Sequence, residues 1–373
     1  MNGIHKKIVV LPGDGIGPEV IGGATRILAD CANAYGHRFE LEEMPFGGNA
    51  IDKFGEPLPP QTLAACREAD AILLGAVGGP RWDSVPLGKR PESGLLALRG
   101  GLDLYINFRP VRVRDSLVGI SPVRAEKVRG CNFEIIRELA GDIYFGAHER
   151  GTKDGRDYAR DVAQYSQAEV ERVARYAFER AASRRKRVTS VDKANVLATS
   201  VLWRDTVNRV ARDYPGITLE HLYVDNAAMQ VVLNPAQFDV IVTANLFGDI
   251  LSDEAAALAG SIGLIPSMSR GRSQKGALFE PIHGSAPSLA GRDVASPLGS
   301  IFCVSLMLRE SFGLVTEAEW IDSAVDRVLE QGYRTADIAE PGTEPVGCTK
   351  MVELIRAEMA ESPLHAERYG WGV

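Results

Sequence analysis

Short apolar runs alternate with helical patterns along most of the chain. A β-type run over Lys7–Pro12 leads into a glycine-rich turn, and Glu19–Ala34 then repeats apolar residues at the spacing of one helix face. Apolar runs recur at Ala71–Val77, Val188–Val191, Leu219–Val224 and Asp239–Thr243. This alternation predicts an α/β fold whose strands are largely parallel.

A helix with a defined start is predicted after Ser166. Ser166-Gln-Ala-Glu169 has the spacing of a capping box. The apolar residues behind it fall on one helix face: Val170, Val173, Ala174, Ala177, Phe178 and Ala181. We expect this helix to end within the basic cluster Arg184–Arg187, which suits the helix dipole and solvent.

A turn signal, Asp154-Gly155, precedes that helix and lies between Tyr144 and Tyr158. An Asp-Gly pair favours the tight turn of a β-hairpin. A hairpin arm of this kind often makes subunit contacts, and an ordinary surface loop fits the same residues equally well.

Composition excludes several classes of protein. The 373 residues suffice for two domains, and 45% hydrophobic with 24% charged residues exclude global disorder. A net charge of −7 disfavours binding to nucleic acid or to an anionic membrane, although a local arginine cluster can still hold a small anion. No run reaches the roughly 18 apolar residues of a spanning helix, and no signal-type segment follows Lys7. A cytoplasmic location is therefore expected.

The turn Gly13-Asp-Gly-Ile-Gly-Pro18 raises the question of dinucleotide binding. The standard GxGxxG fingerprint needs glycine at position 18, where this chain has proline, and Gly17 falls one place early. Glu42 or Glu43 would be the later acid of such a fingerprint. Because the spacing fails, we interpret the turn as a glycine bend that approaches a ligand by another geometry.

The segment Asn245–Asp253 follows the apolar run that ends at Thr243. On a helix that has begun by Gly248, the carboxylates of Asp249 and Asp253 share one face, where like charges repel unless a cation lies between them. Carboxylates without nearby cysteine or histidine favour Mg²⁺ or Mn²⁺ over zinc. The alternative is a pair of acids that favours the positive end of the helix dipole.

Lys193 and Asp225 each stand just past an apolar run. Ligands of open parallel sheets bind beyond the carboxyl ends of the strands, so these two side chains and Asp249 are candidates to converge there. A lysine beside a dication and arginines has its ammonium form disfavoured, which suits proton abstraction. An exposed loop lysine is the alternative interpretation.

Three arginines lie next to apolar residues: Arg99, Arg109 and Arg137. An unpaired guanidinium would be costly there, and three forked donors would match a dicarboxylate. Ion pairs with Glu134 or Glu138 are the alternative for Arg137.

The segment Phe279–Pro287 combines His283 with small residues and prolines. Such residues let the backbone come close to a ligand. A lone histidine is usually structural, so this segment alone identifies no site.

Together these segments resemble the metal-dependent β-decarboxylating dehydrogenases, and the similarity covers nearly the whole chain. Several long motifs in the same order are far more specific than any one of them. The motifs are Leu11–Glu19, Leu74–Pro80, Arg90–Arg99, Arg137–Gly146, Val191–Val196, Tyr223–Met229 and Asn245–Asp253.

The resemblance implies a two-domain open sheet like that of isopropylmalate dehydrogenases, which is not a standard Rossmann fold. One domain, expected to bind the cofactor, would combine residues 1–104 and 260–373. Residues 105–259 would form the second domain, which would hold substrate and metal and make the dimer, with a hairpin arm at about 144–165. Enzymes of this family are homodimers with shared active sites, so Lys193 and Asp225 would act in the partner's site.

The activity implied by the resemblance is oxidative decarboxylation of (2R,3S)-3-isopropylmalate to 4-methyl-2-oxopentanoate and CO₂ with reduction of NAD, in leucine biosynthesis. Lys193 would remove the hydroxyl proton, and Tyr144 would return a proton after CO₂ has left. The substrate carboxylates would bind Arg99, Arg109 and Arg137, and Mg²⁺ or Mn²⁺ would bind Asp225, Asp249 and Asp253.

Substrate choice in the family depends on a side-chain pocket. The matching residues here are Glu92, Leu95, Leu96 and the partner's Val196, a surface that suits an isopropyl group better than a third carboxylate. Alternative substrates are D-malate, tartrate or another 3-alkylmalate. A homologue that binds a dicarboxylate or metal without turnover is the alternative from another class.

NAD is the expected cofactor, with NADP left open. NAD-specific family members have aspartate where this chain has Ser288, and loss of that acid should weaken both NAD affinity and the rejection of NADP. Asparagine is usual at the position of Ser296, and Arg292 is a candidate to meet a 2′-phosphate. The residues expected to contact the cofactor are Gly78, Gly79, His283, Gly284, Ser285, Ala286, Pro287, Ser288 and Ser296.

Overall fold

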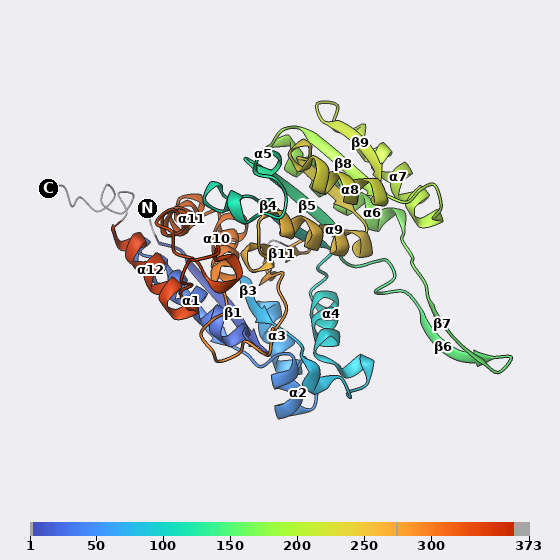
Figure 1. Ribbon diagram of the computed structural model, residues 1–373. Coiled ribbons are helices and arrows are strands. Elements are labelled where there is room, and N and C mark those ends of the chain that lie inside the picture. Colours follow the sequence, from blue (N-terminus) through green and yellow to red (C-terminus); the bar gives the residue numbers. More distant parts are fainter. Residues whose placement is uncertain (1–2, 274, 362–373) are drawn as a thin grey trace. The chain divides into compact units, whose positions relative to one another are not determined.

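The computed structural model describes residues 3–273 and 275–361 (Figure 1). The chain divides into two compact units. Unit 1 takes the described residues of Met1–Asp103, Arg114–Ile120 and Ala259–Val373, and unit 2 takes Leu104–Val113 and Ser121–Leu258. Arg114–Ile120 lies inside the segment assigned from sequence to the second domain, yet it belongs to unit 1. Of the expected cofactor domain, residues 362–373 lie outside the described residues.

The sheet strands of unit 1 follow the order β2-β1-β3-β12-β11. β1 pairs in parallel with β2 and β3, β3 pairs in parallel with β12, and β11 runs antiparallel to β12. All side chains of β3 and β12 are buried, as expected for a sheet covered on both faces. The bounds are β1 His5–Gly13, β2 Arg38–Glu43, β3 Ala71–Ala76, β11 Pro266–Arg270 and β12 Ala277–Pro281.

Two helices of unit 1, α1 and α10, pack on this sheet, and α11 and α12 pack on neighbouring helices. α10 contacts β11, β12 and the neighbouring helices α1 and α11. Every residue of α10 from Leu298 to Leu308 is buried, and the segment is mainly apolar, as expected for a helix enclosed by other elements. The helices are α1 Gly17–Tyr35, α2 Gly48–Phe54, α3 Pro60–Glu68, α4 Pro91–Gly101, α10 Leu298–Phe312, α11 Val315–Glu330 and α12 Cys348–Glu361.

Unit 2 has strands in the order β4-β5-β10-β8-β9. β5–β10, β10–β8 and β8–β9 are parallel pairs, whereas β4 and β5 are antiparallel. The strands are β4 Ile106–Arg112, β5 Asn132–Glu138, β8 Arg187–Asp192, β9 Thr218–Tyr223 and β10 Val240–Thr243. The helices are α5 Ala125–Val128, α6 Gln167–Ala182, α7 Ala198–Ala211, α8 Val224–Leu233 and α9 Asn245–Leu258.

The predicted α/β class with mainly parallel strands is confirmed. Apolar runs do not predict β2, β4 or β5. β2 has no fully buried residue, and β4 and β5 contain the buried charges Arg109, Glu134 and Arg137. Charged residues on a buried strand erase the apolar run that identifies it.

α6 begins with the predicted capping box but ends earlier than expected. The Ser166 hydroxyl accepts from the Glu169 N–H, and the Glu169 carboxylate accepts from the Ser166 N–H. The helix ends at Ala182, so the expected end within Arg184–Arg187 is wrong. The cause is tertiary: the Arg184 guanidinium forms ion pairs with the buried carboxylates of Glu134 and Asp239, which lie at the starts of β5 and β10.

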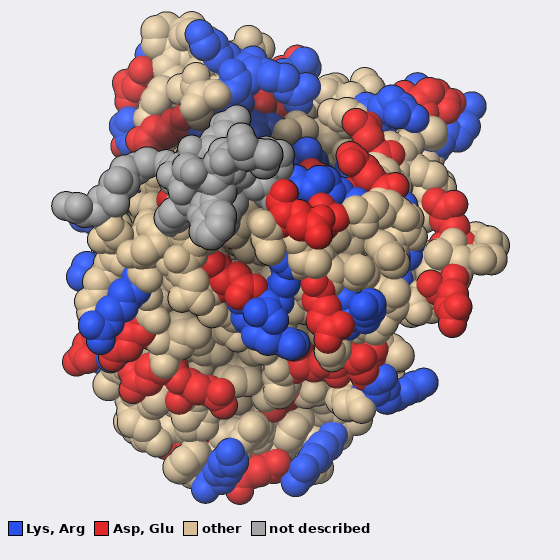
Figure 2. Space-filling view, turned by 90° about the vertical axis from the view of Figure 1, so that its left-hand side faces the viewer, with Lys and Arg blue, Asp and Glu red and all other residues tan. Residues whose placement is uncertain are grey.

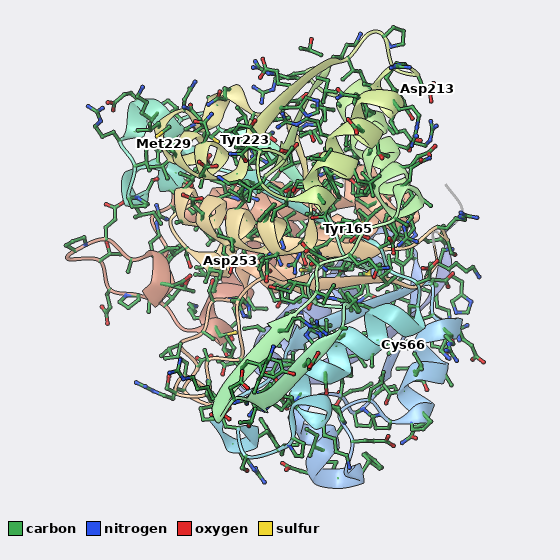
Figure 3. The ribbon with its side chains drawn as sticks, turned by 90° about the vertical axis from the view of Figure 1, so that its right-hand side faces the viewer. Cys66, Tyr165, Asp213, Tyr223, Met229 and Asp253 are labelled. Atoms are coloured by element: carbon green, nitrogen blue, oxygen red, sulfur yellow. The ribbon has the colours of Figure 1, made fainter. Side chains whose placement is uncertain are left out.

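Asp154 and Gly155 form the turn of a β-hairpin. Of the two alternatives for this segment, the hairpin arm is therefore present and the ordinary surface loop is not. Strand β6, His148–Lys153, runs antiparallel to β7, Arg156–Asp161 (Figure 3). The two turn residues have φ of 54° and 72°, and a two-residue type I′ turn requires positive φ at both positions. Every residue of β7 is exposed.

The surface carries charges of both signs. Lys and Arg side chains are interspersed with Asp and Glu side chains on the face drawn in Figure 2. Within residues 3–273 and 275–361, no helix has the length and apolar character needed to cross a membrane.

Candidate active site

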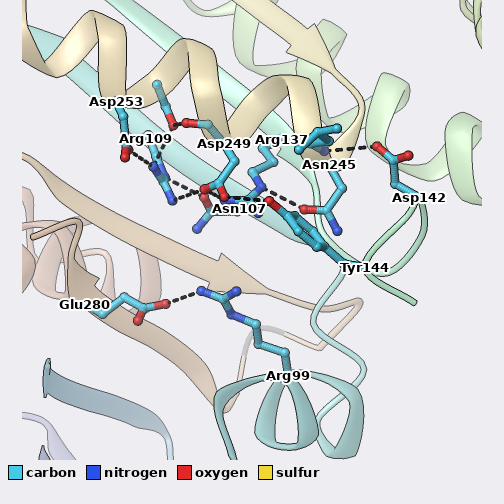
Figure 4. A network of polar contacts seen from close by, with 12 residues as sticks. Arg99, Asn107, Arg109, Arg137, Asp142, Tyr144, Asn245, Asp249, Asp253 and Glu280 are labelled. Atoms are coloured by element: carbon cyan, nitrogen blue, oxygen red, sulfur yellow. Dashed lines mark hydrogen bonds and ion pairs between the residues drawn. The ribbon is translucent and has the colours of Figure 1, made fainter. Parts of the chain in front are cut away.

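Asp249 and Asp253 lie one turn apart on α9, which starts directly after β10. Their side chains are 38% and 55% exposed and face arginines of β4 and β5 (Figure 4). Gly248 makes this approach possible, because a Cβ at that position would lie 2.7 Å from the Cβ of Arg137. The glycine before Asp249 therefore allows α9 to lie against β5.

Arg109 contacts both carboxylates from β4. Its Nη1 donates to Asp253 Oδ1 at 3.0 Å and to the Ser252 hydroxyl at 2.6 Å, and its Nη2 lies 3.5 Å from Asp249 Oδ1. Nε donates to Asn107 Oδ1 at 2.8 Å. Since Asn107 and Arg109 are two residues apart on one strand, their side chains share a face, and Asn107 fixes the orientation of the guanidinium.

Arg137 reaches the same carboxylate from β5. Its Nη1 forms an ion pair with Asp249 Oδ1, and its Nε donates to Asn245 Oδ1 at 2.8 Å. The Tyr144 hydroxyl donates to the other carboxylate oxygen, Asp249 Oδ2, at 3.0 Å. Burial and the Asp249 charge raise the pKa of Tyr144, so this phenol stays protonated and remains a proton donor.

Asn245, the first residue of α9, holds the turn that carries Tyr144. Its side-chain Nδ2 donates to the Gly141 carbonyl at 3.1 Å, and its backbone N–H donates to the Tyr165 hydroxyl at 2.9 Å. The N–H of Leu246 donates to Asp142 Oδ2 at 3.0 Å. Asn245 therefore connects the orientation of Arg137 to the backbone just before Tyr144.

Glu138 supports the same turn from the end of β5. It is fully buried, and its carboxylate accepts from the backbone N–H groups of Ala140 and Gly141 at 3.0 and 2.8 Å. Burial raises its pKa to about 7. Sequence reasoning missed the supporting roles of four residues, which are Asn107, Asn245, Tyr165 and Glu138. The available signals were the period-2 spacing of Asn107 and Arg109 and the position of Asn245 at the start of a helix. We find no sequence signal for the roles of Tyr165 and Glu138.

The charges around α9 suit a divalent cation. Burial raises the pKa of Asp253, the Asp249 charge adds to the shift, and Arg109 opposes it. Asp249 and Asp253 offer two partly exposed carboxylates, which are hard oxygen donors, and the ionised form of Asp253 is disfavoured without a cation. These properties match the donor set of Mg²⁺ or Mn²⁺. Among the described residues, the only three ligand-type atoms within 4.8 Å of one another belong to Glu19, Asp293 and Cys348. Asp225 therefore does not complete a cluster with Asp249 and Asp253 within this chain.

Lys193 and Asp225 form a pair of their own. Lys193 follows β8, Asp225 lies in the first turn of α8 after β9, and the Lys193 Nζ donates to Asp225 Oδ1 at 2.6 Å. The ion pair lowers the pKa of the exposed Asp225 carboxyl. Two of the three residues predicted to converge, Lys193 and Asp225, therefore meet at adjacent parallel strands. Val196, beyond Lys193, is 71% exposed.

Arg99 is the third arginine, and it lies in unit 1 on α4. Its Nη2 pairs with Glu280 Oε1 of β12 at 2.8 Å (Figure 4), while its buried Nε has no hydrogen-bond partner among the described residues. Leu95 and Leu96 are half-buried and Glu92 is exposed on the same helix.

Two loops of unit 1 hold the residues expected to meet the cofactor. Gly78 and Gly79 follow β3 with φ of 99° and 149°, which favours glycine at both positions. In the second loop, His283 Nε2 and Ser296 Oγ are buried without a hydrogen-bond partner in the described part of the chain. Buried polar atoms are normally paired, so these two atoms fit a ligand that supplies the missing partners. Ser288 is exposed, and Arg292 Nη1 lies 3.4 Å from its carbonyl oxygen.

Comparisons with known proteins agree over most of the chain. A family profile described as isocitrate/isopropylmalate dehydrogenase matches residues 7–355. The chain is 54% identical over 354 residues to the 3-isopropylmalate dehydrogenase of Nitratidesulfovibrio vulgaris, covering 94% of this chain and 99% of the relative. It is 50% identical over 354 residues to the enzyme of the same name from Clostridium acetobutylicum, covering 95% and 99%.

Solved structures give the same result. Isocitrate dehydrogenase from Methylococcus capsulatus superposes with a TM-score of 0.85 at 34% identity, covering 95% of this chain and 100% of that chain. A β-decarboxylating dehydrogenase from Thermococcus kodakarensis gives a TM-score of 0.77 at 35% identity, covering 95% and 96%.

Proposed function

The chain belongs to the isocitrate/isopropylmalate dehydrogenase family, and from this membership we propose that it catalyses the NAD-dependent oxidative decarboxylation of (2R,3S)-3-isopropylmalate in leucine biosynthesis. The observation that carries the proposal is the contact set of Asp249. One carboxylate oxygen meets Arg137 and Arg109, and the other accepts from the Tyr144 hydroxyl at 3.0 Å. The Asp249 carboxylate, a candidate metal ligand, therefore contacts two candidate carboxylate-binding groups and a candidate proton donor.

Mg²⁺ or Mn²⁺ would be held by Asp249 and Asp253, with the partner's Asp225 as a further ligand. When bound, the cation stabilises negative charge that develops on substrate oxygens, and NAD accepts the hydride. Arg109 and Arg137 now donate to Asp249 and Asp253. With a cation on those carboxylates, the guanidinium N–H groups of Arg109 and Arg137 would be available to bind the carboxylates of the substrate. We assign Arg99 a similar role from family membership.

Two groups of the chain move protons. The Lys193 amine removes the proton of the substrate hydroxyl, directly or through water, as the carbinol carbon is oxidised. After CO₂ has left, the Tyr144 hydroxyl donates a proton to the carbon that carried the lost carboxylate. The raised pKa of Tyr144 supports this assignment, because the phenol is still protonated at neutral pH.

Substrate choice follows from α4. Leu95 and Leu96 present apolar surface next to Glu92, and the partner's Val196 would add a further apolar side chain. Such a wall stabilises an isopropyl group by burial and offers no partner to a third carboxylate. We therefore place 3-isopropylmalate ahead of isocitrate, D-malate and tartrate.

A homodimer is part of the proposal. α8 and α9 pack against each other and expose large apolar side chains, among them Met229, Leu233 and Ile250 at 51%, 54% and 58% exposure. Clustered exposed apolar side chains of this kind mark an interaction surface. A second copy of the chain that covers this face would also bring its own Lys193 and Asp225. We propose a cytoplasmic location as well.

The coenzyme assignment is NAD bound by unit 1, with Ser288 as the residue that tests it. The exposed Ser288 brings no negative charge to repel a 2′-phosphate, so NADP is the coenzyme to compare.

Initial rates of coenzyme reduction test the whole proposal. The purified protein is assayed with Mg²⁺ and with Mn²⁺, crossing 3-isopropylmalate, D-malate, tartrate and isocitrate with NAD and NADP. We expect the highest kcat/KM for 3-isopropylmalate with NAD. A higher kcat/KM for D-malate or tartrate would overturn the substrate. No turnover with any pair, combined with a substrate-induced rise in Tm, would identify a binding homologue without catalysis.

A further inference from the structure

The turn between β1 and α1 has no role in the chemistry described above, although its glycines stood out in the sequence. Asp14 lies at its centre, and its side chain is buried at 4% exposure. Among the described residues, no lysine, arginine or histidine forms an ion pair with it. A buried carboxylate without a cation needs hydrogen-bond donors, and here they come entirely from the backbone.

Three backbone N–H groups from two other segments donate to Asp14. Gly78, after β3, and Gly48, at the start of α2, donate to Oδ2 at 2.9 and 2.8 Å, and Asn49 donates to Oδ1 at 2.8 Å. Gly47 lets these groups come close, because a Cβ there would lie 2.6 Å from Asp14 Oδ2. One side chain therefore fixes the loop that carries Gly78 and Gly79.

The backbone of the same turn fixes a second loop. The Ile16 N–H donates to the Ser285 carbonyl oxygen at 2.8 Å. Gly15 has a φ of 57°, and a Cβ at this position would lie only 2.0 Å from that oxygen. The close approach needs glycine, and it connects the turn to the segment His283–Ser288.

We propose that the β1–α1 turn is a positioning element for the coenzyme: Asp14 holds the Gly78 loop, and Gly15 with Ile16 holds the Ser285 loop at a fixed spacing. The inference rests on the proposed function, which assigns both loops to NAD. The glycines of this turn do not match a dinucleotide fingerprint, but they affect coenzyme binding indirectly, because they set the separation of the two loops that bind it.

Asp14→Ala and Asp14→Asn test the proposal in a graded way. Alanine removes all three acceptor contacts, while the amide oxygen of asparagine retains part of them. Because loosened loops are binding-competent for a smaller fraction of time, apparent coenzyme affinity falls by that fraction. We expect Asp14→Ala to raise the coenzyme KM and the NADH dissociation constant by about tenfold or more. Asp14→Asn should fall between alanine and wild type. kcat at saturating coenzyme and the KM for 3-isopropylmalate should stay within about twofold of wild type.

The matched control for a loss of stability alone is Asp239→Asn in unit 2. Asp239 is also a buried carboxylate, 1% exposed, and accepts from Arg184 and from the Arg187 N–H. This variant should lower Tm and leave coenzyme KM unchanged. Equal increases of coenzyme KM in the Asp14 and Asp239 variants would overturn the inference.

Gly15→Ala keeps the test informative if Asp14→Ala does not fold. The added Cβ displaces the Ser285 loop, so the coenzyme KM should rise again, whereas Gly22→Ala on α1, where a Cβ meets nothing within 4 Å, should match wild type. Normal NADH binding by folded Asp14→Asn and Gly15→Ala would overturn this inference and leave the proposed function unaffected. Absence of NADH and NADPH binding by the wild type would overturn the proposed function together with it.

Discussion

The Tyr144 hydroxyl donates to Asp249 Oδ2 at 3.0 Å, although the two residues are separated by 105 positions in the sequence. Tyr144 lies in the turn after β5 and Asp249 lies on α9. Arg137 of β5 pairs with the second oxygen of the same carboxylate. The proposed proton donor is therefore placed by a group that would also bind the metal, so the two functions are coupled through one side chain.

Tyr144→Phe removes the proton donor and keeps the aromatic ring. We expect kcat to fall by about 10²–10⁴-fold, because general acid catalysis contributes that much, while KM changes little. Steady-state rates with 3-isopropylmalate and NAD measure it. Tyr158→Phe on the exposed hairpin is the control, and a Tyr144→Phe enzyme with wild-type kcat would refute the donor role.

Lys193→Ala should abolish turnover and leave the fold intact. The Asp225 partner of Lys193 is largely exposed to solvent, where ion pairs contribute little to stability, so Tm should change little. Lys350→Ala, which breaks an exposed pair with Glu353, serves as the matched control. Near-normal activity of Lys193→Ala would remove lysine from the mechanism.

Mixed dimers test whether the two subunits share active sites. Lys193→Ala and Tyr144→Phe enzymes, each inactive alone, are unfolded together and refolded as a mixture. If Lys193 serves the partner's site, each mixed dimer contains one site with both wild-type residues, and activity should recover to roughly a quarter of wild type. Ile250→Asp, which charges the exposed face of α9, should prevent the recovery. No recovery in the mixture of Lys193→Ala and Tyr144→Phe that lacks Ile250→Asp would show that each chain uses its own lysine.

The buried Glu138 predicts a pH dependence of stability. Its pKa is raised from 4.5 to about 7 in the folded protein, so the folded state binds more protons than the unfolded state between these values. Stability from this group is therefore fully present below about pH 4.5 and is lost as pH rises through about 7, by at most about 3 kcal/mol. Tyr165 and Arg172 face the same carboxylate.

Glu138→Gln lacks this titration. Relative to wild type, its Tm should therefore rise progressively between about pH 4.5 and pH 7, as measured by thermal unfolding in a pH series. Glu126→Gln, at an exposed position of α5, should show no such trend. A pH-independent difference between Glu138→Gln and wild type would contradict the raised pKa.

Metal affinity should fall in acid. The pKa of Asp253 is raised in the absence of a cation, so protons compete with the metal for this carboxylate. The Tm increase produced by Mn²⁺ should be smaller at about pH 5 than at about pH 8, and Asp253→Asn should abolish it at both. Chelation of the metal should remove activity, and added Mg²⁺ or Mn²⁺ should restore it. An undiminished Mn²⁺ effect in Asp253→Asn would exclude this residue as a ligand.

The sequence by itself determined the features whose partners lie within a few residues. The capping box of Ser166 and Glu169, the turn at Asp154-Gly155 and the shared helix face of Asp249 and Asp253 follow from local geometry. The α/β class followed in the same way, because several buried parallel strands, such as β3 and β10, are short apolar runs. Family motifs then supplied the candidate roles of Tyr144, Lys193 and the arginines.

Only the tertiary structure decided which separate segments meet. Arg109 lies against Ser252 and Asp253, Asn245 connects Arg137 to the turn before Tyr144, and Asp14 accepts from Gly48, Asn49 and Gly78. The backbone donors of Asp14 carry no side-chain signal, and buried charges on β4 and β5 hide the strands that position the arginines. Long-range pairing depends on how strands and helices pack, and residue type alone does not encode which distant partner a polar group will find.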